Sequence, residues 1–103
     1  VRDYIYIDDA IRGILWLANN ETRHKVYNLG CGYGTSLNEL LQVIEKTLHR
    51  KLKIVRKSGR KVDVPVNYLD ISRFEREFGN FCPISLQDGI SKTADFLQEK
   101  YIR

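Results

Sequence analysis

The chain has 103 residues, 43% of them hydrophobic and 29% charged, with a formal net charge of +4 at neutral pH. This is the composition of one ordinary globular domain, and no apolar run approaches the roughly 20 residues of a membrane span. Cys31 and Cys82 lie far apart without a C-x-x-C spacing, which argues against a zinc site and a disulfide framework. We therefore expect a cytoplasmic protein without a metal or a membrane partner.

Residues 1–7 (VRDYIYI) alternate tyrosine with isoleucine and predict a short strand. Because the sequence opens inside this strand, with no turn before it, we expect a piece of a longer protein. Asp8 and Asp9 then supply an N-cap and a favourable negative charge for a helix over residues 8–20. Apolar residues recur along this helix at helical spacing, namely Ile11, Ile14, Leu15, Trp16, Leu17 and Ala18.

Residues 25–41 (KVYNLGCGYGTSLNELL) predict a strand, a turn with three glycines and a helix from Ser36 to about His49. Ser36 and Glu39 form an S-x-x-E capping box. A dinucleotide-binding loop would need G-x-G-x-x-G and an acid after the next strand, and both are missing. The first motif of S-adenosylmethionine methyltransferases is also similar, but Asn28 stands in place of its acid. We favour a turn that only connects strand to helix.

The second half of the chain continues the alternation of strands and helices. Residues 51–57 alternate leucine and isoleucine with lysine, which predicts a half-buried strand. Gly59 and Pro65 place a loop after it, and residues 68–70 form a short extended piece. We therefore predict an α/β fold in which short strands alternate with about four helices.

The last two helices have clear end signals. Asp70 is the expected N-cap of one helix and Gly79 its C-cap. Ser85 and Asp88 cap the other. The expected buried face of the last helix consists of Leu86, Ile90, Ala94, Leu97 and Tyr101.

Residues 49–61 (HRKLKIVRKSGRK) contain seven lysines and arginines and no acid. Such a run attracts phosphate groups, although lysines also protect the exposed edge of a sheet. A small basic nucleic-acid-binding module is an alternative function for the chain. However, the sequence has no helix-turn-helix, aromatic RNA-binding pattern or zinc framework that would support it.

Catalytic patterns are scarce. His24 lies in a polar turn and His49 at a helix end, and neither is paired with a serine or cysteine nucleophile. Asp8 and Asp9 are adjacent and therefore point in different directions on a helix. We predict no catalytic, cofactor-binding or metal-binding residue in this chain.

Several motifs are more informative together than alone. In order, RDYIYIDD, VYNLGCGYGTSLNEL, GRKVDVP, YLD and ISLQDGI resemble the C-terminal part of NAD-dependent epimerases and dehydratases of nucleotide sugars. These are extended short-chain dehydrogenases, and UDP-glucose 4-epimerases are the most similar members. The resemblance implies that residues 1–30 form the edge strand and helix of a Rossmann-type NAD-binding domain. It implies that residues 31–103 are the nucleotide-sugar-binding, or substrate-binding, portion.

The resemblance also implies a set of binding residues. Arg2, Asp3 and Tyr4 match the family's R-D-Y/F segment, whose arginine reaches the diphosphate of the nucleotide sugar. Arg60 and Asp63 match its R-x-G-D-x-P loop, where the arginine binds the diphosphate and the acid accepts from the ribose. A planar guanidinium suits phosphate oxygens and a carboxylate suits ribose hydroxyls. The substrate-binding residues expected from the resemblance are Arg2, Tyr4, Arg60 and Asp63, and the expected partner is a UDP- or dTDP-sugar.

Two features of the family have no counterpart here. The N-terminal glycine-rich NAD loop is missing, and none of the six tyrosines is followed four residues later by lysine, as the catalytic Y-x-x-x-K pair requires. The chain alone therefore cannot transfer hydride, and we expect NAD in the parent protein, an isomerase or lyase, together with a missing N-terminal NAD-binding domain. Without those neighbours we expect exposed apolar surface around Trp16, Leu17 and the first strand, and self-association.

Overall fold

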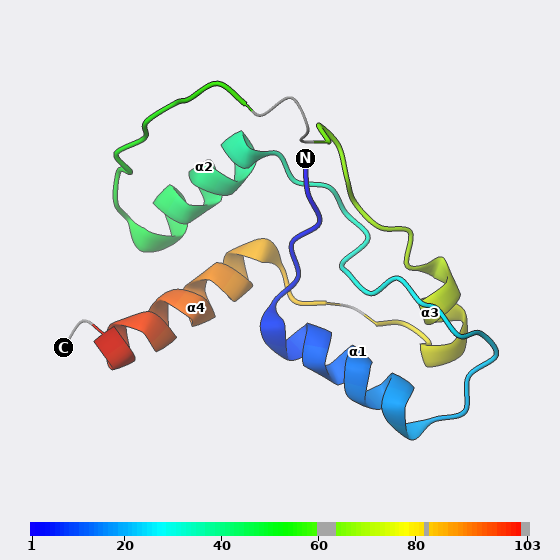
Figure 1. Ribbon diagram of the computed structural model, residues 1–103. Helices are drawn as coiled ribbons and strands as arrows, with labels where there is room; N and C mark the ends of the chain where they lie inside the picture. The colour runs from blue at the N-terminus through cyan, green and yellow to red at the C-terminus, as the bar shows by residue number, and fades with distance from the viewer. Residues whose placement is uncertain (60–63, 82, 102–103) are drawn as a thin grey trace.

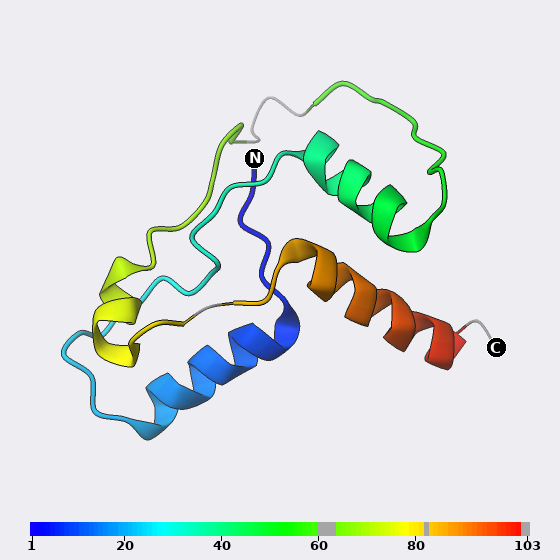
Figure 2. The same ribbon diagram turned by 180° about the vertical axis from the view of Figure 1, so that it is seen from behind.

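A computed structural model describes residues 1–59, 64–81 and 83–101. It contains four helices: α1 (Ile7–Asn19), α2 (Leu37–Leu48), α3 (Ser72–Phe78) and α4 (Leu86–Tyr101). α2 lies beside α4 on one side of the molecule, and α3 lies near the C-terminal half of α1 on the other (Figures 1 and 2).

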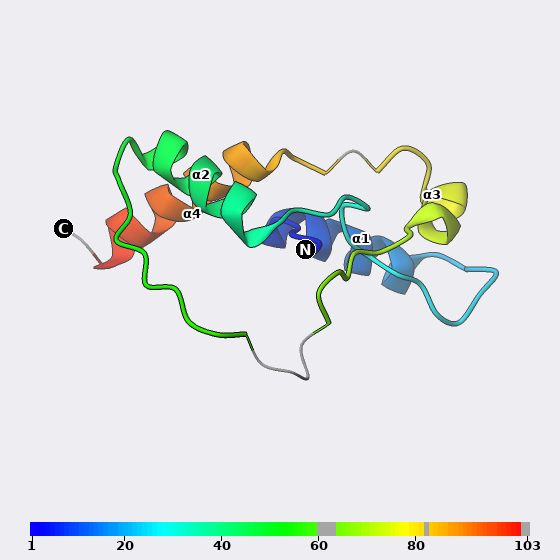
Figure 3. The same cartoon turned by 90° about the horizontal axis from the view of Figure 1, so that it is seen from above.

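The molecule is flat and open, as the view in Figure 3 shows. Its principal extents are 47 × 39 × 20 Å, and its radius of gyration of 16.2 Å exceeds the value of about 13 Å for a compact domain of this length. Only three hydrophobic side chains of the described residues are buried, namely Ile71, Phe74 and Phe81. The chain therefore presents much of its apolar surface to the outside.

The predicted caps at the start of α2, at the end of α3 and at the start of α4 are confirmed. Ser36 Oγ accepts the backbone N–H of Glu39 at 3.1 Å, so α2 begins where the capping box places it. Ser85 Oγ accepts the backbone N–H of Asp88 at 3.1 Å at the start of α4. Gly79 ends α3 with a φ of 96°, a conformation that favours glycine. The predicted N-cap of α3 is wrong, because Ile71 occupies that position and Asp70 lies one residue earlier, where it accepts the backbone N–H of Ser72 at 2.9 Å.

The predicted cap of α1 is wrong. The N-cap position is occupied by Tyr6, which makes no side-chain cap hydrogen bond, and Asp8 and Asp9 lie inside the first turn. Asp9 is 6% exposed and accepts the backbone N–H of Ile84 at 2.8 Å. The Asp9 carboxylate therefore connects α1 to the segment before α4, because a tertiary donor was available to it.

The predicted strands are also wrong, with one local exception. Within the described residues, β pairing is limited to two isolated bridges, both formed by Arg2, one antiparallel to Thr35 and one parallel to Asn67. The strand predicted before the glycine turn, within residues 25–41, and the strand predicted at residues 51–57 make no β pairing with another described segment. A strand needs a neighbour to complete its hydrogen bonds, and no described segment lies beside these two in that way.

An aromatic cluster holds α1, α3 and residue 81 together. Phe74 packs against Phe78, with ring centroids 5.0 Å apart, and against Phe81 at 5.1 Å. The ring of Trp16 meets Phe74 and Phe78 edge to face at 6.0 and 5.4 Å. Such aromatic pairs contribute about 0.5–1.5 kcal/mol each beyond the area that they bury.

The sequence predicted an exposed apolar surface around Trp16 and Leu17. In the structure both side chains are instead partly buried against this cluster. The exposed apolar surface of α1 lies on its other side. It consists of Ile7, Ile11, Ile14 and Leu15, whose side chains are between 45% and 61% exposed. We call these four residues the α1 stripe.

Arg12 joins this cluster to Asp9. Its guanidinium donates to Asp9 at 3.2 Å and to the carbonyl oxygen of Phe81 at 2.8 Å. The same group lies over the Phe81 ring, 4.4 Å from the centroid, and 5.5 Å from the centroid of Phe78. Arg12 thus neutralises a buried carboxylate and covers two aromatic rings at once.

We expect Arg12→Ala to lower the free energy of unfolding by about 2 kcal/mol, because Asp9 would lose its charged partner while staying buried. Chemical denaturation followed by circular dichroism measures this change. The matched control is Arg50→Ala, which removes the same charge from an exposed position and should cost less than about 0.5 kcal/mol. Equal losses in the two variants would contradict the role given to Arg12.

Candidate functional site

The glycine turn is closed by a side chain of the same molecule. The Asp3 carboxylate accepts three backbone N–H groups, from Cys31 at 2.9 Å, Gly32 at 3.0 Å and Leu69 at 3.3 Å. Two of these donors belong to the turn and one to the segment before α3. The carboxylate thus takes the place that an anionic ligand would need.

The glycines of the turn are needed for this close approach. A Cβ atom at Gly30 would lie 2.7 Å from Asp3 Oδ2, and one at Gly34 would lie 2.7 Å from the Val1 side chain. Gly32 has a φ of 76°, which L side chains rarely adopt. The turn therefore does not fit a dinucleotide, and the interpretation as a connecting turn is supported.

Two groups near the turn have shifted pKa values. Burial on its own raises the pKa of Asp3, but its bonds to the Cys31, Leu69 and Gly32 N–H groups and the neighbouring Cys31 thiol outweigh it, and the net pKa is lowered. Burial, reinforced by the Asp3 charge, raises the pKa of the Cys31 thiol. Asp3 is therefore ionised at neutral pH, whereas Cys31 stays a thiol.

Arg2 lies at a junction of three segments. Its backbone exchanges two hydrogen bonds with Thr35, of 2.9 and 2.8 Å, and Asn67 donates to the carbonyl oxygen of Val1 at 2.9 Å. The Arg2 guanidinium donates to the same Val1 oxygen at 2.9 Å. The junction brings the start of the chain, the end of the glycine turn and the residues after the R-x-G-D-x-P loop side by side.

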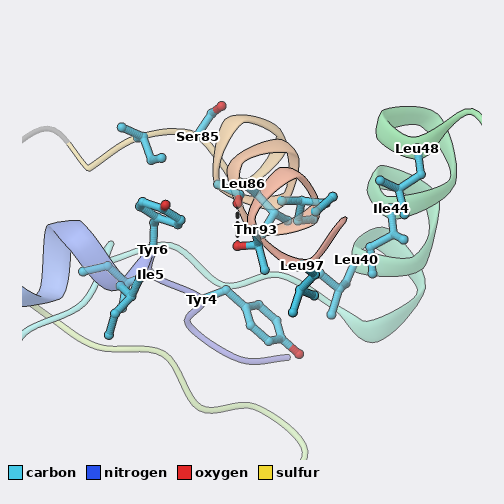
Figure 4. Close-up of a pocket in the computed structure, with 15 residues that line it drawn as sticks. Tyr4, Ile5, Tyr6, Leu40, Ile44, Leu48, Ser85, Leu86, Thr93 and Leu97 are labelled. Atoms are coloured by element: carbon cyan, nitrogen blue, oxygen red, sulfur yellow. Dashed lines mark hydrogen bonds between the residues drawn. The ribbon is translucent and has the colours of Figure 1, made fainter. Parts of the chain in front are cut away.

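Tyr4 is half-buried and lines two hollows. The first is an apolar groove of about 360 Å³ between α2, α4 and the first segment of the chain. Figure 4 shows Leu40, Ile44 and Leu48 of α2 facing α4, with Tyr4 and Tyr6 on the adjoining segment. From α4, Leu86, Ile90, Ala94 and Leu97 line the groove, as expected of its apolar face.

The second hollow, of about 410 Å³, is more polar. Tyr4 and Thr35 line it together with the side of the glycine turn that carries Cys31 and Tyr33, and Glu39 stands at the start of α2. Thr35 is 6% exposed. Of the expected binding residues, Tyr4 contributes directly to this hollow and Arg2 lies two residues away, paired with Thr35.

The other two expected binding residues, Arg60 and Asp63, lie outside the described residues. The basic segment that leads to them is exposed at residues 53–59, and Arg56 donates to Asn38 of α2 at 3.2 Å. The alternative of a nucleic-acid-binding module stays a prediction.

The described residues contain neither a cluster of metal ligands nor a membrane-spanning helix. No group of three or more histidine, cysteine, aspartate or glutamate side chains among these residues is placed to hold a metal ion. Among the same residues, no helix is long and apolar enough to cross a membrane.

Comparison with known proteins gives consistent results. No protein-family model matches the chain. The chain is 29% identical, over 95% of its length, to a UDP-glucuronate 4-epimerase of Thermodesulfobacterium geofontis. It is 32% identical, over 88% of its length, to a dTDP-4-dehydro-6-deoxyglucose reductase of Escherichia coli. It covers 30% and 29% of these two relatives.

A solved structure matches equally well in shape. The crystal structure of UDP-glucose 4-epimerase from Bifidobacterium longum in complex with NAD+ and UDP superposes with a TM-score of 0.85 at 26% identity. The match covers 95% of this chain and 30% of that one. The chain is a relative of the nucleotide-sugar epimerases. The resemblance drawn from the ordered motifs is confirmed, and the chain spans about a third of the length of these relatives.

Within this epimerase-like segment, sequence reasoning missed the role of Asp3. The residue was matched to the R-D-Y/F segment without a function of its own. The available signal was the combination of a short acidic side chain with a glycine turn rich in free N–H groups elsewhere in the chain. Sequence spacing alone could not pair residues 28 positions apart.

We expect Asp3→Asn to lower the free energy of unfolding by about 1–3 kcal/mol, because an amide NH₂ would face backbone N–H donors that the carboxylate now satisfies. Urea denaturation at pH 7 measures the change. Asp95→Asn on the exposed surface of α4 is the matched control and should stay within about 0.5 kcal/mol of the original.

The lowered pKa of Asp3 predicts that the stability difference between the original chain and the Asp3→Asn variant depends on pH. Because folding lowers the pKa of Asp3, its contribution is complete above the unfolded value of about 3.9 and is lost as the pH falls through the folded value. The stability difference between the original chain and Asp3→Asn should therefore be constant from about pH 7 to 5 and shrink below about pH 4. A difference that is independent of pH over the whole range would contradict this account.

Proposed function

We propose that this chain is the nucleotide-sugar-binding part of an NAD-dependent epimerase or dehydratase of the UDP-glucose 4-epimerase type. The observation that carries the proposal is the match of 95% of the chain to an epimerase whose crystal contains NAD+ and UDP. The ordered motifs of the sequence support the same assignment. Residues 1–30 would belong to the edge of the NAD-binding domain and residues 31–103 to the nucleotide-sugar-binding portion.

The proposed ligand contacts follow from the chemistry of a nucleoside diphosphate sugar. Arg2 and Arg60 would bind the diphosphate, because a guanidinium can donate two parallel hydrogen bonds to phosphate oxygens. Asp63 would accept from the ribose hydroxyls, and Tyr4 would form part of the wall in the hollow that it already lines. The junction at Arg2 supports this grouping, since Asn67, four residues after Asp63, pairs with the first residues of the chain.

The redox chemistry would reside elsewhere in the parent protein. NAD supplies hydride transfer in the proposed reaction, and this chain has neither a Y-x-x-x-K pair nor a glycine turn open to a dinucleotide. What these residues would do is bind and orient the nucleotide sugar. A cytoplasmic location stays a prediction.

We expect UDP to perturb the backbone amide chemical shifts around residues 60–67 and around Tyr4 in the intact protein that contains this chain. Arg60→Gln should weaken UDP binding about ten-fold, because one charge-assisted pair is lost. The matched control is Lys92→Gln on α4, which should leave the affinity unchanged. No shift perturbation at millimolar UDP would refute the assignment.

We also propose that the α1 stripe is the surface by which residues 1–30 meet the NAD-binding part of the parent, and by which the isolated chain self-associates. Four large aliphatic side chains exposed in one row support this proposal. Sedimentation velocity should then show a concentration-dependent increase in mass.

The variant Ile14→Lys should return the isolated chain to a monomer. Val55→Lys is the matched control, because Val55 is 73% exposed but lies on the basic segment, away from the stripe. A monomer at every concentration, or equal effects of the two substitutions, would count against the stripe.

A further inference from the structure

A surface hollow with an unusual set of side chains lies at the C-terminal end of α1. It has a volume of about 500 Å³ and is formed where α1, the following loop and α3 meet (Figure 1). The residues that matter for its chemistry come from all three segments, namely Trp16, Asn20, Arg23, Arg73, Arg76 and Glu77. Arg2 and Tyr4, the expected binding residues within the described part of the chain, do not line it.

Three arginines line this hollow, and none of them forms an ion pair within 4 Å with an acid of the described residues, although Arg23 and Arg76 contribute to the lowered pKa values of Glu77 and Asp70. Among the described residues, the ion pair with atoms within 4 Å is that of Arg12 with Asp9, so Arg23, Arg73 and Arg76 are outside any such pair. Arg73 uses one guanidinium nitrogen to donate to the carbonyl oxygen of Val26 at 3.2 Å. This bond fixes the side chain beside the hollow and leaves other N–H groups of the fork for a ligand.

Glu77, one of the two acids that line the hollow, already has hydrogen-bond partners. Glu77 accepts the backbone N–H of Arg23 at 2.8 Å with one oxygen and the hydroxyl of Tyr27 with the other. The Tyr27 hydroxyl, and after it the Arg23 N–H, lower the pKa of Glu77. Glu77 therefore orders the loop that carries Arg23, and it does not form a salt bridge with the arginines.

The wall of the hollow is rigid on its inner side. Trp16 lines it and packs edge to face against Phe74 and Phe78 of the aromatic cluster. The ring gives the hollow one fixed wall, while the side chains of Arg23, Arg73 and Arg76 are exposed to solvent and accessible to an anion. Glu21 and His24 complete the lining, and the acids Glu21 and Glu77 keep the excess of positive charge small.

We propose that this hollow binds a small, multiply charged oxyanion, a phosphate or diphosphate group, through Arg23, Arg73 and Arg76. Three forked donors from two segments can surround one such group, and each offers the geometry that phosphate oxygens accept. The limited volume of the hollow and the two acids that line it favour a small ion over a nucleic acid, which would need an extended basic surface. The site lies apart from the Arg2 junction and adds a second anion site to the proposed function.

Trp16 makes the proposal directly testable, because it is the one tryptophan of the 103 residues. We expect titration of the chain with inorganic pyrophosphate, at constant ionic strength set by sodium chloride, to give a saturable change in Trp16 fluorescence. Isothermal titration calorimetry under the same conditions provides a second readout that does not depend on the ring.

Two variants distinguish binding of pyrophosphate in this hollow from nonspecific attraction of the anion to a positively charged protein. Arg76→Gln should raise the dissociation constant for pyrophosphate about ten-fold. Arg50→Gln removes the same charge from the basic segment, outside the hollow, and should change the dissociation constant less than about two-fold. Circular dichroism melting curves confirm that each variant is folded.

Two results would overturn the proposal. One is the absence of a saturable signal by both fluorescence and calorimetry at several millimolar pyrophosphate. The other is an equal loss of affinity in Arg76→Gln and Arg50→Gln, which would mean that the anion responds to net charge and not to the hollow.

Discussion

The carboxylate of Asp3 joins three parts of the chain that are far apart in the sequence. Its two oxygens accept N–H groups from the glycine turn and from Leu69, so one short side chain connects the first segment, the turn before α2 and the approach to α3. Buried N–H groups without partners are costly, and the glycines leave no side chains to cover them. Together with the backbone bonds of Arg2 to Thr35 and of Asn67 to Val1, this contact holds the three segments side by side.

This contact also occupies the N–H groups of the glycine turn that could otherwise bind an external anion. A glycine turn with free N–H groups is a natural anion site, but here the anion is part of the protein. The hollow beside the turn, lined by Tyr4 and Thr35, is therefore shaped by the turn without using its N–H groups for a ligand. The junction at Arg2 places the residues after the R-x-G-D-x-P loop against the same segment, which fits a binding site formed by loops around an ordered junction.

The open shape of the molecule leaves two apolar surfaces uncovered, one on α1 and one between α2 and α4. The aromatic cluster around Phe74 partly buries one side of α1. The α1 stripe on the other side is not buried by any of the described residues. α2 and α4 pack together, yet the groove between them stays open and apolar. A chain that covers about 30% of its relatives can keep the local packing of that fold, as the TM-score of 0.85 indicates, while many of its surfaces stay exposed.

The sequence by itself determined the four helices, most of their caps and the family, because helical periodicity and capping residues act over a few positions and ordered motifs are specific. Ser36, Ser85 and Gly79 act as predicted. Only the tertiary structure decided that Asp9 faces Ile84 and Arg12, that Asp3 closes the glycine turn and that Trp16 lies against Phe74 and Phe78. Those contacts join residues far apart in the chain, and the predicted strands failed for the same reason, since a strand exists only where another segment completes its hydrogen bonds.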